Sequence, residues 1–499
     1  MNKLMTLLLC DTYKQTHVRQ LPKNITRLVS YWTPRKSMSK KYDKMVFFGL
    51  QAFIKQFLIE DFNINFFSRP LREVLSEYKY YMDIQLGEGN YDTKHIEKLH
   101  KVGYLPLCIK ALPEGSLVNM GIPCIEITNT LPEFAWLVQW IECILQTQLW
   151  PTCAYATVGK IYKTIADEYY ELTSDQNSKM AMADFGMRGM SCIEDAIRTS
   201  ASWLLSFDKT STIPALQYIQ KYYNADKSIG VGGVSTEHSV QCSNFAVDGD
   251  EVTFVKRMLI DLYPNTSFSI VADTYDYWNF VDNVLPSCKK EIMEHNGKMF
   301  VRPDSGNLVE ISVKTIEKLW DMFGGEINSK GFKVLDPHIG VILGDGCTTI
   351  KVEKIYKKLM DLGFAANNIY FGVGAFCFHA LFEEENNFTV VTRDLFGVAM
   401  KSTYLETSNP YKTNKYHIQK NPKTDDDNLK KSHKGCCIVR RTDNGYLCED
   451  GNDFIADSRK SFGLSFINNL KTVFDGSNYV SSYQTDFVDI RKRLETEKL

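Results

Sequence analysis

The stretch MFVRPDSGN at residues 299–307 combines the end of an apolar strand with a polar loop. Phe300 and Val301 are typical of a short buried strand, and Pro303 ends it because proline has no N–H for a sheet ladder. Gly306 lets the backbone come close to a ligand. The stretch therefore predicts a strand end that faces a ligand, the usual position of binding sites in α/β folds.

The same arrangement, an apolar run that ends in acid, glycine, histidine or arginine, recurs along the chain. Consecutive members lie roughly 30 to 50 residues apart, which is the length of one strand, one helix and their loops. This spacing predicts an α/β fold with a parallel (β/α) barrel and one shared site at its mouth. The other members are Ala183–Gly189, Val234–Ser239, Ile270–Asp276, Val341–Gly346 and Ile369–Gly374.

Length and composition indicate a globular protein with more than one domain. The 499 residues exceed one ordinary hydrophobic core, while a hydrophobic content of 44% supplies a large core. A net charge of -2 gives no electrostatic reason to expect nucleic acid or a membrane surface as a partner. No apolar run has the length of a membrane span, so we expect no membrane partner.

Cysteine usage and the N-terminus favour a cytoplasmic protein. The thirteen cysteines contain no CxxC pair, so we expect reduced thiols rather than a disulfide or zinc-ribbon framework. The apolar run Leu4–Leu9 is short and lacks a small-residue cleavage site, so we expect no secretion signal.

Three parts are expected along the chain. Residues 1–150 predict a mixed α+β region with antiparallel strands, and residues 151–400 predict the catalytic barrel. Residues 401–499 predict a C-terminal part that packs back on the N-terminal one and completes a β-rich domain. This last part is expected to contain a mobile loop (Asn409–Lys434), a hairpin (Gly435–Glu449) and a charged helix (Asp489–Leu499).

The strand ends carry the side chains for phosphate and metal chemistry. Converging carboxylates favour Mg²⁺, which prefers oxygen ligands and bridges to substrate phosphates. Arginines offer forked donors to phosphate oxygens, and glycine loops expose backbone N–H groups to them. A phosphorylated sugar is therefore the expected substrate. The residues are Asp184, Asp273, Asp276, Asp304 and Asp345, with Arg188, Arg302 and Arg393, and the loops Gly344–Gly346 and Gly372–Gly374.

Each of these features also has a structural explanation. Asp345 sits in a Gly-Asp-Gly sequence that is often only a turn, and Arg302 can simply pair with a neighbouring acid. Phe185 at a strand end can be a core residue. His238 favours function more clearly, because it lies beside Glu237 and after a glycine turn, where a protonated or phosphorylated imidazole can be stabilised.

Seven motifs in one order resemble the nicotinamide phosphoribosyltransferase family, of the type II phosphoribosyltransferase kind, over nearly the whole chain. The resemblance implies a homodimer with an irregular α/β barrel and with active sites shared between subunits. It also implies condensation of nicotinamide with phosphoribosyl pyrophosphate to nicotinamide mononucleotide and pyrophosphate, in NAD salvage. The motifs are Asp11-Thr12-Tyr13-Lys14, Asp184–Gly189, Glu237-His238-Ser239, Asp273-Thr274-Tyr275-Asp276, Arg302–Gly306, Gly344-Asp345-Gly346 and Thr392-Arg393-Asp394.

The resemblance also assigns roles to residues. Phe185 and the Tyr13 of the other subunit would hold the pyridine ring between them, and Glu237 with His238 would take phosphate from the co-substrate ATP. Carboxylates would hold the ribose, the base region and magnesium-bound phosphates, with Asp304 and Asp345 on the metal. The remaining implied contacts are Asp11 in the first motif, Asp276 at the ribose, and Arg188, Arg302, Arg393, Arg35 and Lys36 at base or phosphates.

One departure from the family's sequence leaves the identity of the base, nicotinamide or nicotinate, undecided. Ser211 stands where the family has an aspartate that accepts a hydrogen bond from the carboxamide of nicotinamide. Nicotinate phosphoribosyltransferase, with the same fold and mechanism, therefore remains an alternative. A second alternative is a barrel metallohydrolase that uses His238, although such an enzyme would need more histidine ligands. A non-catalytic binding protein is a third.

Overall fold

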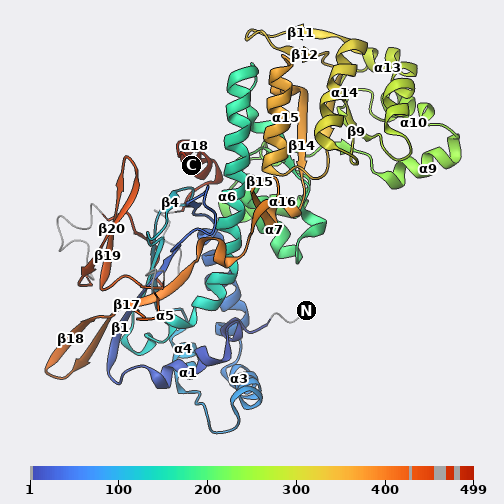
Figure 1. Cartoon of the computed structure of the whole chain (residues 1–499). Helices are drawn as coiled ribbons and strands as arrows, with labels where there is room; N and C mark the ends of the chain where they lie inside the picture. Colours follow the sequence, from blue (N-terminus) through green and yellow to red (C-terminus); the bar gives the residue numbers. More distant parts are fainter. Residues whose placement is uncertain (1–3, 426–429, 455–467, 477–483) are drawn as a thin grey trace. The chain divides into compact units, whose positions relative to one another are not determined.

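The structure, a computed structural model, describes residues 4–425, 430–454, 468–476 and 484–499 (Figure 1). They form two compact units. The first comprises Met1–Thr157, Lys221–Asn224 and Thr392–Leu499 as far as these are described, and the second comprises Val158–Gln220 and Ala225–Val391. The division at residues 150 and 400 that we expect from the sequence stays a prediction.

The second unit is built on a seven-stranded sheet in which every neighbouring pair is parallel. Its strands are short and mostly buried, as expected where helices pack on a parallel sheet. In spatial order they are β7 (Lys209–Thr210), β6 (Met182–Asp184), β14 (Ile369–Val373), β13 (Ile339–Leu343), β10 (Met299–Arg302), β9 (Phe268–Val271) and β8 (Val234–Ser235).

This sheet curls toward a barrel. A parallel bridge between Lys209 of β7 and Val231, just before β8, links the two outer strands. Helices α14 and α15 pack against each other beside the sheet (Figure 1). The helices are α7 (Ile193–Trp203), α8 (Ile213–Tyr223), α9 (His238–Asp248), α10 (Val252–Arg257), α11 (Tyr277–Asn279), α12 (Leu285–Ser287), α13 (Lys289–Glu294), α14 (Leu308–Phe323), α15 (Thr349–Asp361) and α16 (Phe376–His379).

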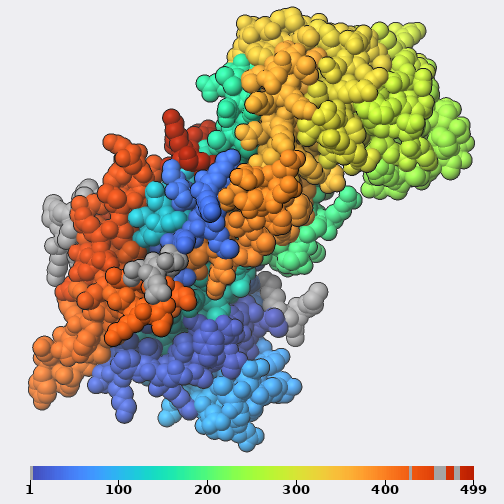
Figure 2. All heavy atoms as spheres, in the orientation of Figure 1, coloured from blue at the N-terminus to red at the C-terminus, as the bar shows by residue number. Residues whose placement is uncertain are grey.

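The first unit contains a six-stranded antiparallel sheet drawn from both ends of the chain. The N-terminal strand β1 lies between β17 and β5, so the C-terminal part completes the sheet. Blue and orange-to-red atoms accordingly lie side by side on this unit in Figure 2. In spatial order the strands are β18 (Lys412–His417), β17 (Ala399–Asn409), β1 (Ile25–Thr33), β5 (Ile125–Asn129), β3 (Leu107–Ala111) and β21 (Lys471–Phe474).

Shorter elements complete both units. Two-stranded sheets pair β2 (Lys44–Val46) with β4 (Leu117–Asn119), β11 (Gly325–Ile327) with β12 (Lys333–Leu335), β15 (Ala380–Glu384) with β16 (Asn387–Val390), and β19 (Cys436–Thr442) with β20 (Gly445–Asn452). The helices of the first unit are α1 (Thr12–Gln20), α2 (Leu50–Phe53), α3 (Leu71–Leu86), α4 (Lys94–Val102), α5 (Leu137–Trp140) and α18 (Phe487–Glu495). Within the described residues, none of the helices has both the length and the apolar composition to cross a membrane.

The sequence analysis predicts the fold, an α/β barrel with an added β-rich domain, and the structure confirms it. The hairpin predicted at Gly435–Glu449 is also present, as β19 and β20. Residues 142–173 form one helix, α6 (Glu142–Thr173), although Pro151 lies inside it and proline usually breaks a helix. Pro151 removes one backbone hydrogen bond, but the buried residues on both sides, Leu149 and Cys153, keep the helix packed through it.

One detail of the expected loop at Asn409–Lys434 differs. Lys412–His417 form strand β18, which pairs with β17 over six residue pairs. Residues 426–429 of the same stretch lie outside the described residues.

Candidate active site

The carboxyl ends of the parallel strands meet at one edge of the second unit, which we call the rim. Because the strands run in one direction, the residue that follows each strand projects at this edge. The rim residues, in the spatial order of the strands, are Ser211, Phe185, Gly374, Asp345, Asp304, Asp273 and His238. The structure thus brings most of the predicted site residues of this unit to one side of the sheet.

Two carboxylates and one imidazole form the centre of the β8–β10 part of the rim. The Nε2 atom of His238 lies 3.9 Å from Oδ1 of Asp273 and 3.9 Å from Oδ2 of Asp304. The other ring nitrogen, Nδ1, lies 3.1 Å from the hydroxyl of Thr274. His238 is 51% exposed, so the imidazole lies beside the two carboxylates and is open to a ligand.

The same two carboxylates each keep one buried oxygen without a hydrogen-bond partner among the described residues. These atoms are Oδ1 of Asp273 and Oδ1 of Asp304. Burial raises the pKa of Asp304, Asp273 and Asp345 add to the increase, and Arg302 and His238 oppose it. One oxygen of each carboxylate and one ring nitrogen of His238 lie within 4.8 Å of one another. Carboxylate oxygens without partners fit a Mg²⁺ ion, which prefers oxygen ligands.

Arg302 and Gly344 fix the position of Asp304. The Nε atom of Arg302 donates to Oδ2 of Asp304 at 3.2 Å, and its Nη1 donates to Ser235 at 2.6 Å. A Cβ atom on Gly344 would lie 2.3 Å from Oδ1 of Asp304, so only glycine leaves room for this carboxylate. The structural explanation of Arg302, pairing with an acid, therefore holds, and the acid is itself a rim residue.

Asp273 also organises the loop after β10. Its Oδ2 atom accepts from the backbone N–H of Asp304 at 3.2 Å and from the hydroxyl of Ser305 at 2.5 Å. The sequence predicts Asp273 as one of the converging carboxylates but gives it no separate role. Asp273 lies two residues after the end of β9, as Asp304 does after β10 and Asp345 after β13. This shared position is the signal that could have indicated its role.

Glu237 and Asp276 make local contacts. The carboxylate of Glu237 accepts a hydrogen bond from the hydroxyl of Ser239 at the start of α9. The side chain of Asp276 accepts from the backbone N–H of Asn279 at 3.0 Å and caps α11. The carboxylates that face the imidazole of His238 are thus Asp273 and Asp304, and the roles predicted for Glu237 and Asp276 stay predictions.

At the other end of the rim, Asp184 is a structural residue. It is fully buried and accepts four hydrogen bonds, so it cannot join the expected acidic cluster at the mouth. The donors are the backbone N–H of Gly186 and the hydroxyls of Ser200, Thr210 and Thr212. Asp184 therefore holds together the loops that carry Phe185 and Ser211.

Phe185 and Ser211 are positioned by this arrangement. A Cβ atom on Gly372 would lie 2.2 Å from Cδ2 of Phe185, so the ring rests directly on the backbone of β14. The exposed Ser211 donates its hydroxyl to the backbone carbonyl of Asp184 at 2.9 Å. Since its proton is used in this way, the Ser211 oxygen is left as an acceptor for a ligand.

Two further residues of this unit were predicted from the sequence. Arg188 is exposed in the turn Met187–Gly189, next to the Phe185 loop. Nothing lies within 4 Å of the position of a Cβ on Gly374, which leaves open space over this part of the backbone. Both lie at the rim, and the roles predicted for them stay predictions.

The remaining predicted residues belong to the first unit. Arg35, Lys36 and Arg393 come together, since the backbone N–H groups of Arg35 and Lys36 donate to the carbonyl of Phe396 at 3.0 and 3.4 Å. Burial and the neighbouring Arg393 lower the pKa of Arg35. Tyr13 is 56% exposed on α1, and Asp11 precedes that helix and accepts from the thiol of Cys143 at 3.3 Å.

A basic cavity of about 260 Å³ lies beside Arg35 in the same unit. Its basic lining residues are Arg35, Lys401, Lys431 and His433. Burial lowers the pKa of Lys401, so an anion bound there would stabilise its charged form. The sequence does not indicate Lys401 and Lys431. Lys401 lies near Arg35 because β17 pairs with β1. Lys431 lies there because the chain on either side of it returns to β17, where the backbone N–H groups of Ile418 and Gly435 donate to the carbonyl of Thr403.

Comparisons with known proteins agree with this geometry. Residues 180–476 match the nicotinate phosphoribosyltransferase (NAPRTase) family, and residues 5–65 match the N-terminal domain of nicotinamide phosphoribosyltransferase. A nicotinamide phosphoribosyltransferase of Acinetobacter baylyi is 36% identical over 510 residues, which cover 97% of this chain and 96% of the relative. The chain belongs to the nicotinate phosphoribosyltransferase family. The predicted family and enzyme class, a pentosyltransferase, are therefore confirmed.

Solved structures of similar fold support the architecture. Nicotinate-nucleotide pyrophosphorylase from Pyrococcus furiosus has a TM-score of 0.57 at 15% identity, covering 100% of this chain and 98% of its own. Human nicotinic acid phosphoribosyltransferase has a TM-score of 0.55 at 13% identity, covering 98% and 93%. At these identities the likeness concerns the fold alone, and it agrees with the curled parallel sheet of the second unit.

Proposed function

We propose that this chain condenses nicotinamide with phosphoribosyl pyrophosphate to give nicotinamide mononucleotide and pyrophosphate, in NAD salvage. One observation carries the proposal: the rim combines an aromatic ring and a hydroxyl acceptor at one end with unpartnered carboxylate oxygens at the other. The first arrangement suits a flat amide, and the second suits a magnesium-bound sugar diphosphate. The relative from Acinetobacter baylyi carries the name of this activity.

The base is assigned to the Phe185 end. Stacking on Phe185 would hold the pyridine ring flat and aim its nitrogen at the anomeric carbon, which lowers the entropy cost of the reaction. The oxygen of Ser211 can accept from the carboxamide N–H₂ of nicotinamide, whereas the carboxylate of nicotinate has no proton to offer. This contact favours nicotinamide over nicotinate.

The sugar diphosphate is assigned to Asp273, Asp304 and Asp345. The ring nitrogen of nicotinamide forms a bond to the anomeric carbon while the bond from that carbon to pyrophosphate breaks. The carboxylates stabilise the positive charge that develops on the ribose. Asp304 with Asp273 or Asp345 would hold Mg²⁺, which supplies positive charge to the departing pyrophosphate. Arg302 and Arg188 offer further donors to phosphate oxygens.

ATP is proposed as a co-substrate that acts through His238. A ring nitrogen of His238 attacks the γ-phosphorus of ATP and releases ADP, and water later hydrolyses the phosphohistidine. The exposure of the imidazole and its position beside Asp273 and Asp304 support a phosphorylated group next to the proposed sugar site. Hydrolysis of that group would drive the unfavourable condensation.

A homodimer in the cytoplasm is part of the proposal. In this arrangement Tyr13 of a second copy covers the pyridine ring, and Arg35, Lys36 and Arg393 bring positive charge to phosphates. The exposure of Tyr13 and the basic cavity beside Arg35 support these roles. In the proposed dimer, the surface at Tyr13 and the surface at the basic cavity are both available to the second chain.

Pyrophosphate release from phosphoribosyl pyrophosphate, with nicotinamide or nicotinate, with and without ATP, tests the proposal. We expect a higher kcat/KM for nicotinamide and stimulation by ATP. A clear preference for nicotinate would replace the proposed base. Release of phosphate from simple esters without phosphoribosyl pyrophosphate would favour the metallohydrolase, and no release of either product would favour a binding protein.

The variant His238→Ala tests the ATP step separately. It should lose stimulation by ATP and keep a slow basal transfer, because the sugar site does not require the imidazole as a nucleophile. Glu291→Gln, at a partly exposed ion pair with Lys256 and away from the motif in the sequence, is the control. If His238→Ala retains full ATP stimulation, the phosphohistidine role is refuted.

A further inference from the structure

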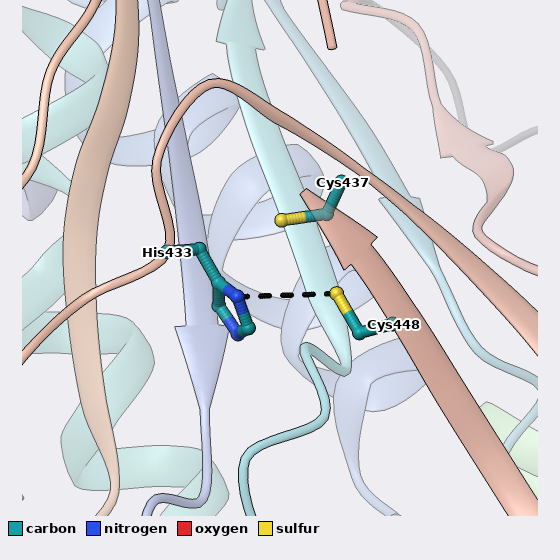
Figure 3. A group of neighbouring side chains, drawn as sticks. All are labelled: His433, Cys437 and Cys448. Carbon is teal, nitrogen blue, oxygen red and sulfur yellow. Dashed lines mark hydrogen bonds between the residues drawn. The ribbon is translucent and has the colours of Figure 1, made fainter. Parts of the chain in front are cut away.

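A second cluster of reactive side chains lies in the first unit, on the hairpin of β19 and β20. The thiols of Cys437 and Cys448 and the imidazole of His433 point toward one another (Figure 3). Their ligand atoms all lie within 4.8 Å of one another, and Nδ1 of His433 is 3.9 Å from Sγ of Cys448. None of these residues takes part in the proposed transfer reaction.

The register of the hairpin brings the two thiols to one face. Cys448 on β20 is the partner of Val439 on β19, and Cys437 precedes Val439 by two residues. Residues two apart in a strand share a face, so the two cysteines are diagonal neighbours on that face. A register shift between Cys436 and Ile438 adjusts the position of Cys437. Sequence spacing alone does not indicate this pair, because ten residues separate the cysteines.

The orientation of His433 is fixed from behind. Its Nε2 atom lies 2.9 Å from the backbone carbonyl of Gly121. A carbonyl can only accept, so Nε2 carries the proton and Nδ1 presents its lone pair to the thiols. Metal-binding histidines are held by the same kind of contact, in which the second ring nitrogen donates to a carbonyl or carboxylate.

A fourth potential ligand is present. Oδ2 of Asp450 lies 3.6 Å from Nδ1 of His433 and also accepts the backbone N–H of Lys434 at 2.9 Å. Cys437 is only 2% exposed, whereas Cys448 and His433 are half-buried, so the cluster is sheltered but accessible to a small ion. Two sulfurs, one nitrogen and one oxygen form a set that favours zinc over magnesium or calcium.

We propose that Cys437, Cys448 and His433 bind a thiophilic divalent cation, zinc, with Asp450 or water as the fourth ligand. Tetrahedral zinc with usual bond lengths needs sulfur and nitrogen roughly 3.5 Å apart, and the observed 3.9 Å requires only a small movement. The ion joins the segment that carries His433 to the hairpin. Since His433 and Lys431 line the basic cavity, zinc would hold one wall of that cavity in place.

Cobalt titration of the full chain tests the site without using activity. The chain is purified with reductant, stripped with a chelator and titrated with Co²⁺ alone. We expect thiolate-to-cobalt charge-transfer absorption and the visible bands of tetrahedral cobalt. Both should saturate at about one ion per chain and disappear when zinc is added.

Variants identify the ligands. Cys448→Ser should lower bound zinc from about one per chain to below about one tenth, and His433→Gln should weaken Co²⁺ binding by about tenfold or more. Cys108→Ser is the matched control, since Cys108 is a half-buried free thiol on β3 of the same unit, outside the cluster. It should bind like the unsubstituted chain.

Three results would overturn the proposal. One is the absence of thiolate-to-cobalt absorption in the folded, reduced chain. Another is equal zinc content in the unsubstituted chain and in folded Cys448→Ser. The third is a Cys437–Cys448 disulfide found by mass spectrometry in a chain that takes up no zinc after reduction. If Cys448→Ser fails to fold, the cobalt spectra of the unsubstituted chain and of His433→Gln still decide.

Discussion

At the β6–β7 end of the rim Asp184 accepts four hydrogen bonds, whereas at the β9–β10 end Asp273 and Asp304 each keep one buried oxygen without a partner among the described residues. All three carboxylates lie at or just after the end of a parallel strand. A buried acceptor without a partner costs about 1–3 kcal/mol, so such atoms indicate a site that a ligand completes. A carboxylate whose oxygens all accept hydrogen bonds instead indicates a role in stabilising the fold.

The largest effect on stability is expected at the saturated end. Asp184→Ala leaves the hydroxyls of Ser200, Thr210 and Thr212 without their common acceptor. The free energy of unfolding should fall by about 3–5 kcal/mol, measured by denaturant unfolding. Asp273→Ala is the matched control at the other end, and its stability should fall less because Asp273 accepts two hydrogen bonds rather than four and one of its oxygens has no partner to lose. Equal losses in both variants would remove the distinction between the two ends.

A smaller, purely kinetic effect is expected at Gly372. In Gly372→Ala the new Cβ displaces the ring of Phe185, and KM for the base should rise by about tenfold to a hundredfold. Steady-state kinetics with varied nicotinamide measures this. Gly363→Ala serves as a control for alanine substitution of a glycine, since no atom lies within 4 Å of its Cβ position, although its positive φ gives it a small strain of its own. An unchanged KM in Gly372→Ala would mean that Phe185 does not hold the base.

The smallest effect concerns pH and Asp304. Because burial and neighbouring acids raise the pKa of this carboxyl above its unfolded value, the protonated form stabilises the fold. That stabilisation is complete below the unfolded pKa, about 3.9, and is lost as pH rises through the higher folded value. Asp304→Asn does not titrate, so its melting temperature relative to the unsubstituted chain should increase as the pH rises above about 4. A constant difference would contradict the raised pKa.

Much of the fold and part of the site could be predicted from the sequence. Apolar runs that end in polar loops at regular spacing predict parallel strands and therefore a common rim, and Asp304, His238 and Phe185 lie there. The fate of each acid could not be predicted, because saturation of Asp184 depends on hydroxyls from α7 and the β7 loop. Asp276 caps a helix for a similarly local reason.

Contacts between distant segments account for the rest. The basic cavity unites Arg35 with Lys401 because β1 and β17 pair, and with Lys431 because the chain on either side of Lys431 returns to Thr403 of β17. The cluster of His433, Cys437 and Cys448 depends on hairpin register and on a carbonyl of Gly121, more than 300 residues away in the chain. Local patterns carry no information about such pairings.

The central claim, that the β9–β10 end of the rim carries phosphoribosyl transfer, is tested most directly by one paired assay. Pyrophosphate release from nicotinamide and phosphoribosyl pyrophosphate is compared between the unsubstituted chain and Asp304→Asn, both shown to be folded. We predict release by the unsubstituted chain and a loss of about a hundredfold to a thousandfold in the variant. Equal rates in the two proteins would contradict the account.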